Sequence, residues 1–340
     1  MQEKINTGRN VCSDVVLSSR VRLARNIQGI PFPVRLNTIE KQKLNLSVCK
    51  ALLNAGLPLK VIDMGSIYPY EAISLAERHL ISPEFASGSE GRFLLISEDE
   101  SISIMLCEKD HIRIQGFSEG LAPEAAYEKA SLYDDILSSA VHYAFDNKLG
   151  FLNQNPSDLG TGMRASVLMH LPALSRTGAM AKFSITAGKL GFRIRGSYGD
   201  GASAKGDIFR ISNYITMGIS EEKALENLKS IALQLATRER DAAEELINDI
   251  STVDRINRAE GLLKNAVLLS ADEMTELLSW VRLGAVYGIN KCSITEIDRM
   301  FTAMQPASLN VLAGGKLTAA QRSEIRAKTV KTIFRDNEAE

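Results

Sequence analysis

The spacing of apolar and polar residues predicts a β-strand near the start of the chain. Apolar and polar positions partly alternate over residues 15–26, with the period of two that a strand requires. This alternation places Arg20 and Arg22 on one face of the strand, and it places Val21 and Leu23 on the other. Two arginines on one face repel each other unless an anion lies between them. The segment is therefore either a solvated edge strand or part of an anion-binding site.

The pattern then switches between helical and strand periods. A capping-box pair, Asn37 and Glu40, begins a helix that Gly56 ends. Pro123 begins a long core helix whose apolar positions continue to Phe145. The remaining elements predicted up to residue 217 are a helix over 70–80, a β-meander over 93–117, a helix over 172–187, and strands over 192–195 and 209–217.

Helix-forming residues dominate after residue 220. Ser220 is a typical N-cap, and Glu221 and Glu222 follow it at the positive end of the helix dipole. Further apolar stripes predict helices over 254–264, 271–283, 293–304 and 318–334. The sequence beyond residue 250 is therefore expected to be wholly α-helical. We place the two domains at residues 10–245 and 246–340.

Length and composition limit the function. The 340 residues suffice for two domains of ~100–200 residues each. A net charge of −1 argues against a dedicated nucleic-acid-binding protein. No run approaches the ~20 apolar residues of a membrane span, so we expect a soluble, cytoplasmic protein without a membrane or direct nucleic-acid partner. Scattered cysteines and histidines predict neither a metal site made by protein ligands nor a disulfide framework.

A glycine-containing stretch, N-P-S-D-L-G-T-G-M-R-A-S-V-L-M-H-L at 155–171, is the strongest local signal. Gly160 and Gly162 permit backbone conformations of positive φ, and a strand-like apolar run follows them. Arg164 lies at the junction, where backbone N–H groups and a guanidinium can converge on an anion such as phosphate. The alternative is an ordinary β-turn followed by a strand whose arginine reaches solvent.

A second glycine-rich stretch covers residues 196–207, with Asp200 at its middle. Such loops often close over ligands, although neither the P-loop nor the dinucleotide-binding pattern occurs in the chain. Arginines recur beside strands or glycine loops throughout the first domain. If they converge in space, they form a clamp for a polyanion. The arginines concerned are Arg20, Arg22, Arg113, Arg164 and Arg195.

Four motifs resemble, in order, those of the phosphagen (ATP:guanido) kinases: S-S-R-V-R-L-A-R-N at 18–26, E-K-D-H-I-R at 108–113, N-P-S-D-L-G-T-G-M-R-A-S at 155–166 and R-G-S-Y-G-D at 195–200. The run at 211–222 and the helical tail are similar to those of the bacterial protein arginine kinases. The resemblance spans nearly the whole chain. It implies an α+β fold, with a glutamine-synthetase-like antiparallel sheet flanked by helices and an all-α dimerisation and regulatory domain behind it.

The resemblance also implies a function. The chain would transfer the γ-phosphoryl group of ATP, with Mg²⁺, to the guanidinium of arginine residues in proteins, and the five arginines would hold the nucleotide phosphates. The implied partners are proteins with exposed arginines, a zinc-finger activator protein, a Clp-type chaperone-protease and a second copy of the chain. The alternative is a catalytically weak or inactive relative that binds nucleotide or phosphoarginine as a regulatory protein.

The sequence departs from the family at three catalytic positions. Lys109 stands where the family has a glutamate, and a lysine repels a guanidinium. Asp200 replaces a longer glutamate, and Asn155 replaces a cysteine. We expect Glu108 to face away from the site, because neighbours in a strand point to opposite sides. Glu119 is another acid that could enter the acceptor pocket. Activity is therefore expected to be impaired.

The tail carries two further expectations. Arg322, Ser323 and Arg326 stand in place of the family's regulatory phosphoarginine pocket, and a plain helix surface is the alternative. The tail also contains more apolar residues than one helical layer is expected to bury, which favours a symmetric dimer. These residues are Leu262, Leu263, Leu277, Leu278, Val281 and Leu283.

Overall fold

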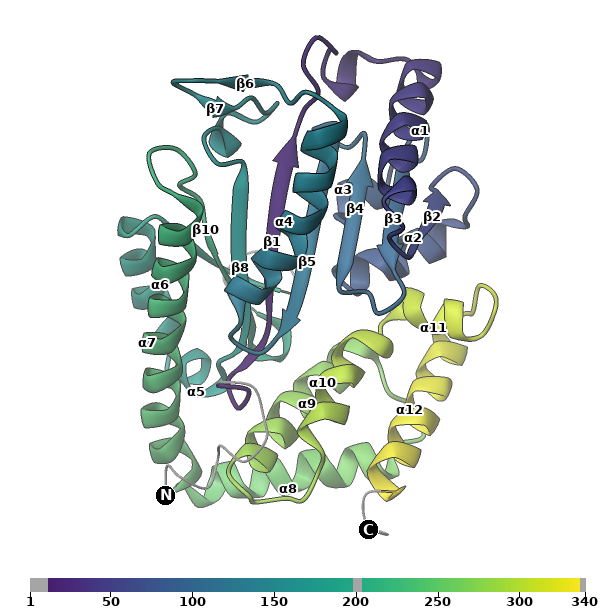
Figure 1. The fold of residues 1–340 in the computed structure, drawn as a ribbon. Helices are drawn as coiled ribbons and strands as arrows, with labels where there is room; N and C mark the ends of the chain where they lie inside the picture. Colours follow the sequence, from purple (N-terminus) through teal and green to yellow (C-terminus); the bar gives the residue numbers. More distant parts are fainter. Residues whose placement is uncertain (1–11, 198–203, 337–340) are drawn as a thin grey trace.

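A computed structural model describes residues 12–197 and 204–336. Within them, eight strands form one sheet in the order β2-β3-β4-β5-β1-β8-β10-β9 (Figure 1). Every neighbouring pair is antiparallel, so the expected antiparallel sheet is confirmed. The strands are β1 (Val16–Arg25), β2 (Leu59–Asp63), β3 (Phe93–Ser97), β4 (Ile102–Leu106), β5 (Ile112–Glu119), β8 (Met163–His170), β9 (Phe192–Gly196) and β10 (Ile208–Asn213).

The first strand of the chain is central rather than at the edge. β1 pairs with β5 on one side and with β8 on the other, so the edge-strand alternative is wrong. Its apolar residues, Val21 and Leu23, are buried in the main core as the alternation predicts. Helices α4 (Pro123–Ala140) and α7 (Glu221–Ile247) pack over this part of the sheet (Figure 1). The apolar face is thus covered, and the face with Arg20 and Arg22 points away from it.

Two predicted helices differ from the observed ones. Helix α4 ends at Ala140, because the segment after it pairs with the chain beyond β1: the Ala144 N–H donates to the Asn26 carbonyl. Phe145 lies instead in a small hairpin of β6 (Phe145–Asp146) and β7 (Gly150–Phe151). The predicted helix over 172–187 is two helices separated by Gly178, whose φ is 73°. The helices of the catalytic part not yet given are α1 (Thr38–Asn54), α2 (Pro69–Glu77), α3 (Pro83–Ala86), α5 (Pro172–Arg176) and α6 (Met180–Lys189).

The chain beyond residue 250 is helical, as expected. Helix α11, a short helix that begins with proline, was not predicted from the sequence. The tail has its own apolar core, which includes Ile256, Leu278 and Phe301. The domain boundary near residue 245 remains a prediction, since α7 continues without a break to Ile247. The tail helices are α8 (Ile250–Asn265), α9 (Ala271–Val286), α10 (Ile294–Ala303), α11 (Pro306–Leu312) and α12 (Ala319–Asp336).

Most of the apolar tail residues that were expected to form a dimer interface are buried within the chain. Leu263, Leu278, Val281 and Leu283 are all buried within the chain itself, while Leu262 is 50% exposed. Several tail helices pack on one another, so they bury more apolar surface than the single layer assumed from the sequence. The dimer therefore remains a prediction without that argument. Among the described residues, no helix is long and apolar enough to cross a membrane.

Candidate active site

One face of the sheet carries a row of side chains that crosses five strands and is polar on all of them except β5. In the register of the ladders, Phe117, Arg20, Ser166, Ser212 and Arg193 are successive neighbours on β5, β1, β8, β10 and β9. Residues two positions along a strand share its face, so the next row is on the same side of the sheet.

That next row places two cations opposite each other. Arg22 on β1 is the direct partner of Arg164 on β8, although 142 positions separate them in the sequence. Like charges directly opposite on neighbouring strands destabilise a sheet. The pair therefore requires negative charge between or beside the two guanidinium groups.

The arginine face lines a cavity of about 380 Å³. All five arginines predicted to bind the nucleotide border it, as do Lys109 and Asn155. The convergence that sequence spacing could not establish is therefore confirmed. Two more arginines, Arg193 and Arg210, also border it and were missed as site residues. Arg193 could have been found, because it lies two residues before Arg195 and shares its strand face.

The cavity concentrates positive charge that the protein only partly neutralises. Burial lowers the pKa of Arg20 well below its ordinary value, and the charges of Arg210, Arg22 and Arg113 lower it further. The Nε atoms of Arg20 and Arg113 are buried without a hydrogen-bond partner among the described residues. Buried donors are normally satisfied, so these groups suit a ligand that carries several anionic oxygens.

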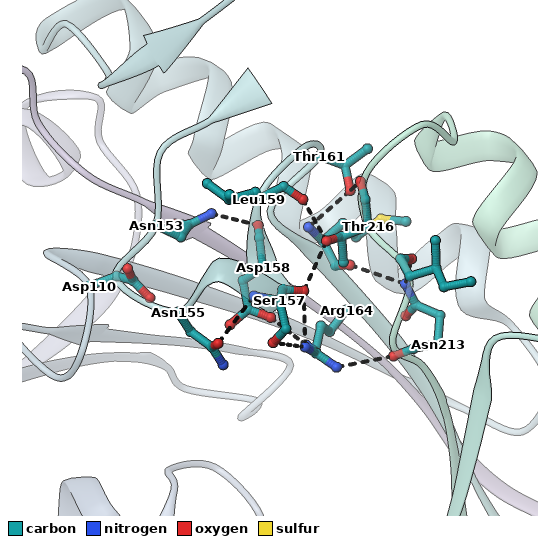
Figure 2. Close-up of polar contacts among 12 residues, drawn as sticks. Asp110, Asn153, Asn155, Ser157, Asp158, Leu159, Thr161, Arg164, Asn213 and Thr216 are labelled. Atoms are coloured by element: carbon teal, nitrogen blue, oxygen red, sulfur yellow. Dashed lines mark hydrogen bonds and ion pairs between the residues drawn. The ribbon is translucent and has the colours of Figure 1, made fainter. Parts of the chain in front are cut away.

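The loop before β8 holds Arg164 in place. Asn155 begins a 3-10 turn (Pro156–Asp158), and its side-chain oxygen accepts a hydrogen bond from the Ser157 N–H at 3.1 Å. Arg164 donates from Nε to Asp158 at 2.5 Å and from Nη2 to the Ser157 hydroxyl at 2.7 Å (Figure 2). Gly160 has a φ of 89°, and a Cβ there would lie 2.2 Å from the Thr216 carbonyl oxygen. The alternative of a solvent-directed arginine is wrong.

The backbone of this loop does not form the anion cradle that we expected. The N–H groups of residues 157–161 all bond to acceptors within the protein. For example, the Gly160 N–H donates to Leu149 and the Thr161 N–H donates to Thr216. The Arg164 side chain borders the cavity, whereas these amides are engaged within the protein. The glycines serve close packing of the loop instead.

The turn between β4 and β5 ties together motifs that are far apart in sequence. The buried Asp110 carboxylate accepts hydrogen bonds from Asn26 at 2.8 Å, from the Gln154 N–H at 2.9 Å and from Arg113 at 3.2 Å. The His111 ring accepts the Ile27 N–H at Nδ1, so its proton is on Nε2. Burial lowers the pKa of His111, which favours this neutral form. The turn thus fixes Arg113 relative to β1.

This turn also corrects the expected position of Glu108. Residues 107–111 are not a strand, because Cys107 has a φ of 60° and the chain reverses there. Glu108 is buried, and its carboxylate accepts hydrogen bonds from Arg113 and from the Ser82 hydroxyl. Lys109 is exposed at the cavity. The alternating-face argument was therefore wrong, and Glu108 belongs to the arginine cluster.

The acids available on the acceptor side are few. Glu119 borders a different cavity, so it is not a substitute for the missing glutamate. Glu84, on the four-residue helix α3, is exposed and borders the arginine cavity. Burial lowers the pKa of Arg22, and the charge of Glu84 is among those that oppose this shift. Asp200 lies outside the described residues.

Models of two protein domains match almost the whole chain. The model described as ATP:guanido phosphotransferase, C-terminal catalytic domain, matches residues 41–242, and the one described as protein-arginine kinase McsB C-terminal domain matches residues 249–340. The chain belongs to the ATP:guanido phosphotransferase family.

Individual relatives agree with this assignment. A protein-arginine kinase of Caldanaerobacter subterraneus is 39% identical over 331 residues, which cover 96% of this chain and 98% of the relative. One of a Geobacillus species is 41% identical, over 94% of this chain and 90% of the relative. A duplicated taurocyamine kinase from Schistosoma mansoni, solved with transition state analog components, has a TM-score of 0.60 at 25% identity. That match covers 69% of this chain and only 35% of the duplicated enzyme.

The family is named for phosphoryl transfer from ATP, and the cavity residues suit the phosphates of that nucleotide. The buried Nε groups of Arg20 and Arg113, which lack a hydrogen-bond partner among the described residues, fit the anionic oxygens of a polyphosphate. Among the described residues, no group of three histidines, cysteines or acids could hold a metal ion. A magnesium ion here would therefore take most of its oxygen ligands from phosphate groups and water, as Mg²⁺ commonly does.

A second cavity, of about 530 Å³, adjoins the first and shares Arg20, Ser166 and Arg210 with it. His79 borders this second cavity with a φ of 63°, and burial lowers the pKa of its imidazole well below the ordinary value. The ring is therefore neutral at pH 7. The two cavities together offer a strongly cationic compartment beside a more apolar one.

The tail residues matched to the family's phosphoarginine pocket have structural contacts. Arg326 is 2% exposed and donates to the carbonyls of Met304 and Leu269, each at 2.8 Å. Arg322 donates to the Leu317 carbonyl at 2.5 Å, and the Ser323 carbonyl accepts the Leu269 N–H. Arg326 is thus not part of a plain helix surface. The phosphoarginine pocket remains a prediction.

Proposed function

We propose that this protein is an ATP-dependent protein-arginine kinase, which transfers a phosphoryl group to the guanidinium of arginine residues in other proteins. The observation that carries this proposal is the arginine face of the sheet, on which Arg22 lies directly opposite Arg164 and borders the same cavity as Arg20 and Arg113. Relatives that share 96% of the chain length and carry the name protein-arginine kinase support the choice of acceptor.

The arginines would act on the phosphates by position and charge. The transfer breaks the bond between the γ-phosphorus and its bridging oxygen and forms a bond from the same phosphorus to a guanidinium nitrogen. The nucleoside diphosphate leaves, and the nitrogen loses a proton to water. Fixed guanidinium groups stabilise the charge that spreads over the phosphoryl oxygens and the leaving group. A bound magnesium ion would neutralise part of the same charge.

The adjoining cavity suits the nucleoside part of the substrate. It meets the arginine cavity at Arg20 and Arg210, so a triphosphate held there would place its nucleoside on that side. The neutral His79 ring and the apolar Phe117 and Leu168 offer surfaces against which a base can pack.

The acceptor side supports a second candidate function. Lys109 is exposed at the cavity and would oppose an incoming guanidinium, whereas Glu84 is the exposed carboxylate described there. This arrangement favours slow catalysis, and it also favours a regulatory protein that binds nucleotide without turnover. Lys109 is the specific observation for that second candidate.

One experiment separates the two candidates. The full chain is incubated with casein and γ-labelled MgATP, and the labelled casein is then treated with acid. An arginine kinase gives label that acid removes, because a phosphoramidate is acid-labile. Arg22→Ala should abolish the label, while Arg258→Ala, at an exposed arginine of the tail, should not. Nucleotide binding without acid-labile label would favour the regulatory protein, and acid-stable label would contradict both candidates.

The cellular setting follows the same proposal. We propose that the protein acts in the cytoplasm, in stress response and protein quality control, as a homodimer. A zinc-finger activator protein and a Clp-type chaperone-protease are the partners that the family resemblance suggests. Light scattering at tens of micromolar tests the dimer, since a monomeric mass would contradict it.

A further inference from the structure

Helix α10 turns its polar side toward a cavity. Thr295, Asp298, Arg299 and Thr302 are spaced by three or four positions, so they share one side of the helix. All four border the 530 Å³ cavity. The side that carries Ile297 and Met300 is buried in the core of the tail. The tail domain thus contributes one wall of a cavity whose opposite wall is the catalytic sheet.

The wall of this cavity that the sheet forms is continuous with the arginine face, because Arg20 borders both cavities. Ser18 on β1 and Leu168 on β8 are paired in register, two residues along from the pair of Arg20 and Ser166. Two residues of a strand span ~7 Å. If the phosphates of a ligand lie at Arg20 and Arg22, the part of the ligand next to the phosphates would lie over Ser18 and Leu168. That part would also lie beneath α10.

A buried arginine holds α10 in this position. Arg282, from α9, has a side chain with no exposed surface, and it donates to the Asp298 carboxylate at 2.6 Å. The same guanidinium donates to the main-chain carbonyl of Asp14 at 2.7 Å, just before β1 begins. One guanidinium therefore connects α10 to the start of the central strand. The wall formed by α10 is anchored to the sheet.

We infer that α10 contacts the nucleoside of the bound nucleotide, so that the C-terminal helical domain forms part of the nucleotide site. This inference rests on the proposed nucleotide-dependent function. Thr295, Arg299 and Thr302 provide the contacts, while Asp298 is occupied with Arg282. Nucleotide affinity is then linked to the position of the tail, because anything that moves α10 changes the nucleoside contacts and not the phosphate contacts.

The test compares two ligands on the full chain. Calorimetry measures the dissociation constants of MgADP and of magnesium tripolyphosphate, which has phosphates but no nucleoside. Thr302→Trp fills the cavity from α10 and should weaken MgADP binding at least tenfold, while tripolyphosphate binding changes less than twofold. The matched control is Thr332→Trp on α12, at an exposed threonine whose hydroxyl donates to the Lys328 carbonyl as that of Thr302 donates to Arg299. It should change neither constant.

A second variant, which shortens a side chain, keeps the test valid if Thr302→Trp does not fold. Arg299→Ala removes an exposed side chain and should weaken MgADP binding about two- to tenfold, the usual range for one polar contact, without affecting tripolyphosphate. Unchanged MgADP binding in both variants would overturn the inference, as would equal losses for the two ligands. Failure of the wild-type protein to bind either ligand would instead refute the proposed function itself.

Discussion

The two sides of the arginine cavity are built differently. On the side that we propose binds the phosphates, Arg22, Arg113 and Arg164 project from strands in the middle of the sheet, and buried acids or loop oxygens hold two of them. On the side that we propose binds the acceptor, Lys109 comes from a turn and Glu84 from a four-residue helix, and both are exposed. The substitutions at Lys109 and Asn155 lie in turns and not on the strands of the sheet. A rigid sheet can thus preserve phosphate binding while the acceptor side changes.

The largest expected effect is on the phosphate side. Arg22→Ala removes the cation that faces Arg164, and it should weaken MgADP binding by about 10²-fold, because hydrogen bonds to charged groups contribute ~1.5–3 kcal/mol each. Calorimetry with MgADP measures the loss, with Arg258→Ala as the control. Binding that stays within threefold of wild type would mean that the phosphates lie elsewhere.

Substitutions at Glu108 and at the neighbouring Lys109 should have different effects on the free energy of unfolding. Glu108→Ala leaves the buried Arg113 with one carboxylate fewer, so the free energy of unfolding should fall by about 3 kcal/mol, as when a buried ion pair loses one partner. Lys109→Ala, at the exposed next position, should change it by less than ~0.5 kcal/mol. Urea denaturation of both variants gives the comparison. Equal effects would show that the turn does not separate the two side chains as described.

The smallest expected effect concerns Asn155. Asn155→Cys restores the residue type of the family, but it removes the side-chain oxygen that accepts the Ser157 N–H. The free energy of unfolding should fall by about 1 kcal/mol, the usual cost of losing such a cap. Phosphoarginine formation should change less than about tenfold, because Lys109 remains. A larger rise in rate at unchanged stability would make Asn155, and not Lys109, the limiting substitution.

Local patterns predicted the strands and the arginine face, but not how the strands assemble. Alternation along β1 correctly placed Arg20 and Arg22 on one face. The approach of Arg164 depends on pairing between β1 and β8, more than 140 positions apart at that point, which no local pattern encodes. That Arg22 and Arg164 are neighbours could therefore not be predicted from the sequence and is known only from the structure.

The features that were predicted wrongly or missed also have physical causes. Glu108 was assigned to the wrong side because the turn places a positive φ at Cys107 and not at a glycine, so nothing in the residue types marked it. The burial of Arg326 was missed because its acceptors, the carbonyls of Met304 and Leu269, are backbone groups from other helices. The wall formed by α10 arises from domain packing through Arg282, which likewise has no sequence signature.

We propose that the phosphate side of the cavity is intact and that the acceptor side limits the reaction. At ~4 Å two like charges cost ~4 kcal/mol at an effective dielectric constant of 20, or roughly 10³-fold in affinity, but solvent screens an exposed lysine such as Lys109 and reduces this. Lys109→Glu should therefore raise phosphoarginine formation by about tenfold, and further when combined with Asp200→Glu.

The most direct test measures two quantities on wild type and on the Lys109→Glu, Asp200→Glu double variant: the dissociation constant of MgADP and the rate of phosphoarginine formation on casein at saturating MgATP. We expect an unchanged dissociation constant of MgADP and a raised rate of phosphoarginine formation in the double variant. Rapid turnover by wild type that falls when Lys109 becomes glutamate would contradict it, because the lysine would then assist the reaction.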